Sequence, residues 1–184
     1  MLFVFAAPSG TGKTSIYKHV LEDFPGLVFS VSATTRKKRD GEIDGVDYYY
    51  INREDFEIKI KNDEFIEYEK VYDDYYGTLK IFVDETVKKK ENMVLDLDVN
   101  GALNIKKLYK NDSVLIFIKP PDKNEIVKRL EKRRTESDEV ISKRLERFDY
   151  EMGKMNDFDY IVTNEYLDTA IKNVEEIIKK NIKK

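Results

Sequence analysis

The first residues constrain the fold more than any other stretch of the chain. An apolar run, Leu2–Ala6, ends at Pro8 and is followed by SGTGKTS, a segment rich in glycine and hydroxyl residues with one lysine. A short apolar run bounded by turn residues predicts a buried strand. The expected order is strand, tight loop and helix, an arrangement that directs backbone N–H groups toward an anion.

The loop matches a phosphate-binding pattern at all but its first position. In the pattern G-x-x-x-x-G-K-[ST], Ala7 stands where glycine is usual. Gly10 and Gly12 allow the backbone to wrap around a phosphate. Lys13 can reach the terminal phosphates, and the Thr14 hydroxyl can ligate Mg²⁺. Alanine is small enough for its position unless a positive φ is needed there. The alternative is a plain Gly/Ser turn with an exposed lysine, which the spacing and context disfavour.

Five short apolar runs predict the strands of one sheet: Leu2–Ala6, Leu27–Val31, Met93–Leu97, Val114–Ile118 and Tyr160–Val162. Segments with helical spacing lie between them. The clearest is near the C-terminus, where Leu167, Ile171, Val174 and Ile178 follow one another at steps of 4, 3 and 4. Strands that alternate with helices predict an α/β fold with a parallel sheet covered on both faces.

The composition fits one domain and excludes several classes of function. The chain has 184 residues, of which 41% are hydrophobic and 38% charged, as in folded globular proteins. Its net charge of −3 leaves no general basic field for long nucleic acid. Cysteine is absent, which excludes disulfides and thiolate metal sites. No segment approaches the ~20 apolar residues of a membrane span, and the opening run lacks a basic flank, so we expect a cytoplasmic protein without a membrane partner.

Residues 33–82 interrupt the alternation of strands and helices. This stretch is aromatic and charged, and we expect a small inserted subdomain of short strands and one helix, capped by Asn52. It opens with TTRKKRDGEIDGVDYYY, in which Arg36 and Arg39 precede Tyr48. The planar fork of arginine and a tyrosine hydroxyl suit a phosphate. A solvated basic loop is the alternative.

The second half of this stretch carries a carboxylate in an aromatic setting. The segment EFIEYEKVYDDYYGT contains Glu67 and ends at Thr78. A carboxylate accepts both N–H donors on the edge of guanine and a hydroxyl donates to O6, whereas adenine would leave the carboxylate unpaired. From the residues alone, a half-exposed glutamate on a strand is an equally good interpretation.

Two further segments contain candidate site residues. MVLDLDVNG ends a predicted strand with Asp96 and Asp98, where an acid can orient Mg²⁺ or its waters toward the phosphate loop. Both acids could instead be ordinary residues at a strand end. The charged stretch 128–144, KRLEKRRTESDEVISKR, is a second candidate insertion.

Together these stretches resemble the guanylate kinases, which transfer the γ-phosphate of ATP to GMP. The motifs that carry the resemblance span nearly the whole chain: APSGTGKTS, FSVSATTRKKRDGEIDGVDYYYI, EFIEYEKVYDDYYGT, VLDLDVNG, IFIKPP and IVTNEYLDTA. The second and third are specific to the family, whereas the phosphate loop is shared with many NTPases. The resemblance implies a P-loop NTPase fold, a role in purine nucleotide metabolism, Mg²⁺ as cofactor, and ATP with GMP or dGMP as substrates. Monomer and homodimer are both left open.

The resemblance also assigns residues. For ATP it implies Ala7, Pro8, Ser9, Gly10, Thr11, Gly12, Lys13, Thr14 and Asn164. For the metal it implies Thr14 and Asp96. For the GMP phosphate it implies Arg36, Arg39, Tyr48 and Tyr76, with Glu42 in the same motif. For guanine it implies Ser32, Glu67 and Thr78, with Asp98 as the acid on the GMP side. The implied catalytic set is Lys13, Arg36 and three lid arginines that close over ATP, Arg129, Arg133 and Arg144.

The sequence departs from the family pattern in three segments. Ala7 replaces the first glycine of the phosphate loop, and Asn100 stands where glutamine is usual. In the lid, Lys132 and Arg134 replace the glycines of a G-R-G pattern. These two replacements should stiffen the turn, and they leave open whether Arg133 or Arg134 is the lid arginine.

The expected layout is a single domain. Its core comprises residues 1–32, 83–127 and 145–184, with a GMP-binding insertion at 33–82 and a helical lid at 128–144. Two other functions remain as alternatives. A non-catalytic guanylate-kinase-like module would hold a phosphorylated peptide, but the intact Gly12-Lys13-Thr14 argues against it. A related kinase would phosphorylate a sugar phosphate, but Glu67 and Thr78 favour a base.

Overall fold

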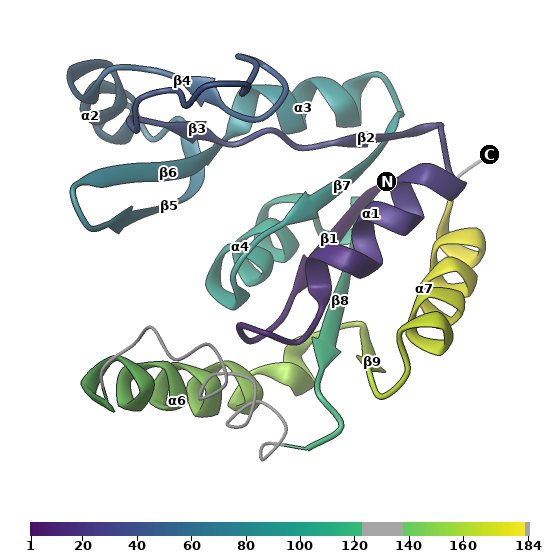
Figure 1. Cartoon of the computed structure of the whole chain (residues 1–184). Helices are drawn as coiled ribbons and strands as arrows, with labels where there is room; N and C mark the ends of the chain where they lie inside the picture. The colour runs from purple at the N-terminus through teal and green to yellow at the C-terminus, as the bar shows by residue number, and fades with distance from the viewer. Residues whose placement is uncertain (123–137, 183–184) are drawn as a thin grey trace.

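The strand formed by the first residues, β1 (Leu2–Ala6), lies at the centre of a five-stranded parallel sheet in the computed structural model (Figure 1). The strand order is β2-β7-β1-β8-β9. The other strands are β2 (Leu27–Phe29), β7 (Asn92–Asp96), β8 (Ser113–Lys119) and β9 (Tyr160–Thr163). The structure describes residues 1–122 and 138–182, and for residues 138–144 the backbone alone.

The predicted parallel α/β sheet is confirmed, with small shifts at the strand ends. β2 ends at Phe29 rather than Val31, because the chain turns away from the sheet at Ser30. The Ser30 N–H still donates to the Val94 carbonyl at 2.9 Å, so the chain leaves β7 gradually. β7 begins and ends one residue earlier than expected, and β8 is longer by one residue at each end.

Helices cover both faces of this sheet, and β1 supplies side chains to each face. The covering helices are α1 (Lys13–Asp23), α3 (Lys80–Lys88), α4 (Val99–Tyr109) and α7 (Leu167–Asn181). All five side chains of β1 are fully buried. Phe3 and Phe5 pack in the cluster formed with α1 and α7, whereas Leu2, Val4 and Ala6 pack in the cluster formed with α3 and α4. The alternation is that of a strand covered on both sides.

The helical spacing near the C-terminus is also confirmed. In α7 the buried residues are Ala170, Ile171, Val174 and Ile178. Leu167, which the sequence spacing places in the same stripe, is the first residue of the helix and stays 38% exposed. The stripe therefore begins one turn later than its sequence spacing suggests.

The stretch predicted as an insertion forms a second, smaller sheet beside the first (Figure 1). Its order is β4-β3-β6-β5, with β3 (Ala33–Thr34), β4 (Tyr49–Tyr50), β5 (Phe65–Val71) and β6 (Asp74–Leu79). β3 pairs parallel with β4 and antiparallel with β6. The helix of this unit is α2 (Arg53–Lys61), and Asn52 caps it as predicted, because its Oδ1 accepts the Asp55 N–H at 2.8 Å.

The second sheet has a core of its own around Phe56 of α2. Phe56 is fully buried, and its ring stacks on those of Phe65 (centroids 4.3 Å apart) and Tyr75 (5.2 Å). Ala33 and Leu79 complete the buried cluster. This aromatic cluster explains why a unit of short strands holds together beside the main sheet.

The charged stretch 128–144 lies mostly outside the described residues. Its last part, from Asp138, begins α6 (Asp138–Gly153), which extends away from the main sheet (Figure 1). Two short 3₁₀ turns, η1 (Lys110–Asp112) and η2 (Met155–Asp157), complete the described elements. Among these, no helix is both long and apolar enough to cross a membrane.

We predict that Phe56→Ala destabilises the protein by about 3–5 kcal/mol, because it empties the centre of the smaller core. Ile58→Ala on the same helix is the matched control: Ile58 is 46% exposed, and its loss should cost less than about 1 kcal/mol. Urea unfolding followed by circular dichroism measures both. Equal effects of the two substitutions would contradict a separate core around Phe56.

Candidate functional site

The carboxyl ends of the parallel strands meet at one edge of the main sheet, and the phosphate loop lies there. Residues 7–14, all predicted to contact ATP, line a cavity of about 620 Å³. Asp98, Arg147 and Glu151 line the same cavity. The loop thus faces groups that come from the end of β7 and from α6.

Two glycines of the loop adopt a conformation that side chains disfavour. Gly10 has φ +84° and Gly12 φ +88°. A Cβ at Gly12 would also lie only 2.5 Å from Asn164 Nδ2. Ala7 is not among the described non-glycine residues with positive φ. Its replacement of the usual glycine therefore introduces no backbone strain.

Asn164 supports the loop from behind. Its side chain is buried, and its Nδ2 donates to the Thr11 carbonyl at 2.7 Å, while its backbone N–H donates to the Lys119 carbonyl at 2.8 Å. Thr11 closes the turn by donating its hydroxyl to the Pro8 carbonyl at 2.9 Å. Asn164 therefore holds the loop in shape; its predicted contact with adenine stays a prediction.

Lys13 is the first residue of α1, and its ammonium group has two partners at the end of β7. It forms an ion pair with Asp96, and it donates to the Leu97 carbonyl at 3.1 Å. Tyr17, one turn later on α1, interacts through its hydroxyl with both Thr14 and Asp96. Burial, and then the negative charge of Asp96, raises the pKa of Tyr17 to about 12, so this hydroxyl stays protonated.

The two residues predicted to serve the metal are thus linked through Tyr17. Thr14 supplies a hydroxyl and Asp96 a carboxylate, both of which are oxygen ligands. The described residues contain no group of three or more acidic or histidine side chains that could hold a metal by themselves. This donor set fits Mg²⁺, which keeps several waters and takes other ligands from substrate phosphates.

The residues predicted to bind the GMP phosphate cluster around Arg36 on the second sheet. Arg36 donates to both oxygens of Glu42, at 3.1 and 2.7 Å. Its guanidinium lies 5.4 Å from the centre of the Tyr48 ring and interacts with Tyr76, whose ring is 5.8 Å from that of Tyr48. Tyr50, which the sequence reasoning missed, donates its hydroxyl to Glu42 at 2.7 Å.

Glu42 is the centre of this cluster. The Arg36 guanidinium, the Arg39 N–H and the Tyr50 hydroxyl all donate to it, and they lower its pKa to about 2. Glu42 therefore stays ionised and fixes the direction of Arg36. The Arg39 side chain is exposed, and its charge acts on Tyr48. Four of the five predicted phosphate-site residues thus share direct contacts, and Arg39 joins through its backbone.

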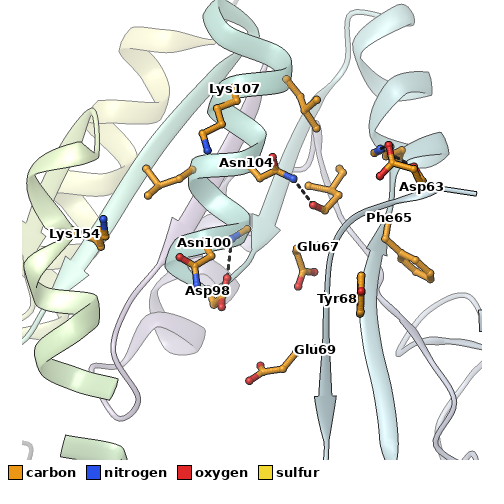
Figure 2. Close-up of a pocket in the computed structure, with 15 residues that line it drawn as sticks. Asp63, Phe65, Glu67, Tyr68, Glu69, Asp98, Asn100, Asn104, Lys107 and Lys154 are labelled. Atoms are coloured by element: carbon orange, nitrogen blue, oxygen red, sulfur yellow. Dashed lines mark hydrogen bonds and ion pairs between the residues drawn. The ribbon is translucent and has the colours of Figure 1, made fainter. Parts of the chain in front are cut away.

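Glu67 and Thr78, the candidate residues for binding the base, lie where β5 faces the start of α4. The Thr78 hydroxyl donates to Glu67 Oε1 at 2.8 Å. Figure 2 shows Glu67 and Glu69 pointing from β5 toward Asp98. All three acids line a second cavity, of about 840 Å³. Ser32 lies one residue before β3, whose Ala33 pairs with Gly77 of β6, so it neighbours Thr78 across the strands.

Asp98 has a structural role at this place as well. Its Oδ1 accepts the Gly101 N–H at 2.7 Å and caps α4. Gly101 leaves room for Glu67, because a Cβ there would lie 2.7 Å from Glu67 Cγ. Burial, and then the charges of Asp98 and Glu69, raises the pKa of Glu67 to about 7. The sequence motif did not reveal this dependence on neighbouring acids.

The predicted lid arginines cannot be placed beside these groups. Arg129 and Arg133 lie outside the described residues, and Arg144 has only its backbone described, within α6. Sequence reasoning did not single out Arg147, three residues further along this helix. It reaches Glu69 Oε1 at 2.9 Å and Asp98 Oδ2 at 3.6 Å, and it pairs with Glu151 Oε1 at 3.0 Å. Only the pair with Glu151, at helical spacing i,i+4, leaves a signal in the sequence.

The fold and the site define a P-loop kinase-like protein with a phosphate loop on the main sheet and a second, arginine-centred cluster on the smaller sheet. The family model for guanylate kinase matches residues 1–181. The guanylate kinase of Chlorobium luteolum is 46% identical over 173 residues, which is 94% of this chain and 88% of that protein. That of Thermotoga maritima is 44% identical over 178 residues, 97% of this chain and 86% of that protein.

A solved structure agrees with this relationship. The crystal structure of guanylate kinase from Anaplasma phagocytophilum superposes with a TM-score of 0.75 at 28% identity, covering 100% of this chain and 87% of that chain. The chain belongs to the guanylate kinase family.

We predict that Glu67→Gln stabilises the folded protein at neutral and alkaline pH. Between about pH 4.5 and 7 the folded state keeps a proton on Glu67 that the unfolded state has released, so raising the pH lowers the free energy of unfolding. Relative to the wild type, the variant should gain up to about 3 kcal/mol above pH 7, and lose this pH-dependent gain below about pH 4.5. Urea unfolding across this range measures the difference. Parallel pH profiles of the two proteins would contradict the raised pKa.

Proposed function

We infer that the chain is an ATP:GMP phosphotransferase, which converts ATP and GMP to ADP and GDP. One observation carries the proposal: a phosphate loop with its lysine and a second, arginine-centred cluster accompany a partly buried carboxylate paired with a hydroxyl. A kinase that acts on a nucleoside monophosphate needs a site for the phosphates of the donor, a site for the phosphate of the acceptor and a site for its base. Membership of the guanylate kinase family supports the assignment of guanine as the base.

On the donor side, we assign the ATP phosphates to the loop of residues 7–14. The loop N–H groups and the N-terminus of α1 stabilise negative charge there. Lys13 would exchange its partner Asp96 for the terminal phosphates, and Thr14 and Asp96 would hold Mg²⁺ and its waters. When bound, the ion neutralises charge on the β- and γ-phosphates.

On the acceptor side, we assign the 5′-phosphate of GMP to the cluster around Arg36. Glu42 orients the Arg36 guanidinium, and the hydroxyls of Tyr48 and Tyr76 supply neutral donors. The exposed side chain of Arg39 is free to turn toward the same phosphate. Two arginines and two tyrosines match the charge and geometry of a phosphate dianion.

The base is assigned to Glu67, with Ser32, Thr78 and Asp98 beside it. Ionised Glu67 accepts N1–H and N2–H₂ of guanine. Thr78, which donates to Glu67 in the free protein, would turn its hydroxyl toward O6. Because the pKa of Glu67 is about 7, guanine binding favours its ionised form and weakens as the pH falls below that value.

Catalysis then rests on positioning and on neutralising charge, and no general base is required. Lys13 and Arg36 act on the donor and acceptor phosphates from the described part of the chain. The roles given to Arg129, Arg133 and Arg144 remain proposals from the family motif. We likewise retain the layout of a core, a GMP-binding insertion at 33–82 and a lid at 128–144.

Mg²⁺ is the expected cofactor and dGMP a second acceptor. A cytoplasmic location suits a chain that works on ATP and GMP. For assembly, a monomer and a homodimer both remain open, and sedimentation at working concentration distinguishes them.

The direct test is ADP formation from Mg²⁺-ATP with GMP, dGMP, AMP, CMP, UMP or no acceptor. We expect turnover with GMP and dGMP alone, and a loss of at least about 100-fold in kcat for Lys13→Ala, because one preorganised donor to the transferred phosphate is removed. Unchanged turnover in this variant would contradict the donor site.

The same panel separates the alternatives. ADP formed without any acceptor would indicate an ATPase. Failure with every nucleotide, but reaction with a sugar phosphate, would favour the related kinase. No turnover together with no Mg²⁺-dependent affinity for ATP would favour a phosphopeptide-binding module.

We predict that Gly101→Ala raises the KM for GMP by about 10-fold or more while the KM for ATP stays unchanged. The new methyl group displaces Glu67. Losing its hydrogen bonds to guanine should cost about 1.5–3 kcal/mol of binding free energy, which corresponds to about 10-fold or more in affinity. Gly153→Ala is the matched control, since a Cβ there meets nothing within 4 Å. Equal KM values for GMP in the two variants would contradict the place given to the base.

A further inference from the structure

Arg147 joins three parts of the molecule through its guanidinium. Nη1 contacts Glu69 of β5 at 2.9 Å, and Nη2 lies 3.6 Å from Asp98 at the start of α4. Nε contacts Glu151 on its own helix at 3.0 Å. α6, the inserted sheet and the start of α4 thus meet at one side chain, which also lines the cavity of the phosphate loop.

The charges around this side chain are mostly negative. Glu67, Glu69 and Asp98 lie together at the acceptor cleft (Figure 2), and the proposed acceptor itself carries a phosphate. Like charges that are not compensated raise the free energy of binding an anion there. Another cation is therefore needed near these acids.

The other cations of the cleft do not meet this need. Lys80 is paired with Asp63 at 2.5 Å. Figure 2 shows Lys107 and Lys154 on the side of the cavity remote from Glu69. Lys13 is paired with Asp96. Among the described residues, Arg147 is the cation that contacts both Glu69 and Asp98.

We propose that Arg147 is a positioning residue for the acceptor nucleotide. It holds Glu69 and Asp98 in place and neutralises them, so that the ionised form of Glu67 and the GMP phosphate are both tolerated in one cleft. This inference rests on the proposed function, because it assigns Arg147 to the GMP half of that site. Arg147 differs in this from the lid arginines, which the family motif assigns to ATP.

Because the ion pairs of Arg147 are exposed, we expect its removal to weaken nucleotide binding rather than to lower the stability of the fold. The side chains of Arg147 and Glu69 are each 49% exposed, and exposed ion pairs contribute little to folding. Several groups face Glu67: the Thr78 hydroxyl from β6, Asp98 from α4 and Glu69 from its own strand. Of these groups, the two acids are the partners of Arg147, so its removal raises the pH at which Glu67 ionises.

The experiment compares Arg147→Gln, Arg147→Lys and the wild type in the full chain. For Arg147→Gln we expect the KM for GMP to rise about 10-fold at pH 7, the KM for ATP to change less than about twofold, and the pH profile of the KM for GMP to move to higher pH. Arg147→Lys should restore most of the affinity for GMP, since it keeps the charge.

A control separates these effects from the loss of any surface ion pair. Lys89→Gln removes an exposed i,i+4 pair with Glu85, whose atoms lie 3.7 Å apart. Its free energy of unfolding in urea should equal that of Arg147→Gln, but its KM values for GMP and for ATP should equal those of the wild type. In a double-mutant cycle, Glu69→Gln should lower the KM for GMP in the Arg147→Gln background, where the charge of Glu69 is no longer compensated, by more than it does in the wild type, which would support the coupling.

Three outcomes would overturn the proposal. A rise in the KM for ATP equal to or greater than that for GMP would assign Arg147 to the donor. Unchanged KM values and an unchanged pH profile would leave it no role in binding. A loss of folding stability in both Arg147 variants, without a selective effect on GMP, would make it structural. Failure of the wild type itself to use GMP would refute the proposed function, and it would be seen before any variant is compared.

Discussion

The complete burial of β1 is the constraint on which the rest of the structure depends. Five apolar side chains can be covered on both faces only if the strand lies in the middle of the sheet with helices on either side. Its backbone then pairs with β7 and β8 at once, and Phe5 stands level with Asp96 and Ile116. This register brings the loop after β1 and the acids after β7 to the same edge. The contact between Lys13 and Asp96 follows from that arrangement.

The two sheets divide the chemistry between them. The main sheet carries the phosphate loop, and the inserted sheet carries the side chains that we propose recognise a second anion and a base. Two glutamates of the inserted sheet show how environment sets their roles. Arg36 holds the pKa of Glu42 at about 2, so that this side chain serves as a fixed support. Burial raises the pKa of Glu67 to about 7, so that its charge depends on its neighbours and on what binds.

Much of the fold could be predicted because its signals are local. Each strand of the main sheet is a short apolar run, and the phosphate loop is contiguous. The contacts that shape the site are not local. Asn164 supports Thr11 from the other end of the chain, and Arg147 meets Glu69 and Asp98 only once α6 is placed against both sheets. A sequence motif identifies such residues only when they recur in the members of a family. They do not show that Asn164 is a buried support, nor that Arg147 belongs to the site.

The position of β1 also has a consequence for how the protein is made. The ribosome delivers the chain from its N-terminus, so β1 and the loop are synthesised before β7, β8 and Asn164. Yet Leu2 pairs with Met93 and Ser113, and the amide that supports the loop belongs to Asn164. Until those residues emerge, the most apolar strand has no partners and the loop has no support. The segment proposed to bind ATP thus leaves the ribosome well before the residues that complete its sheet and support its loop.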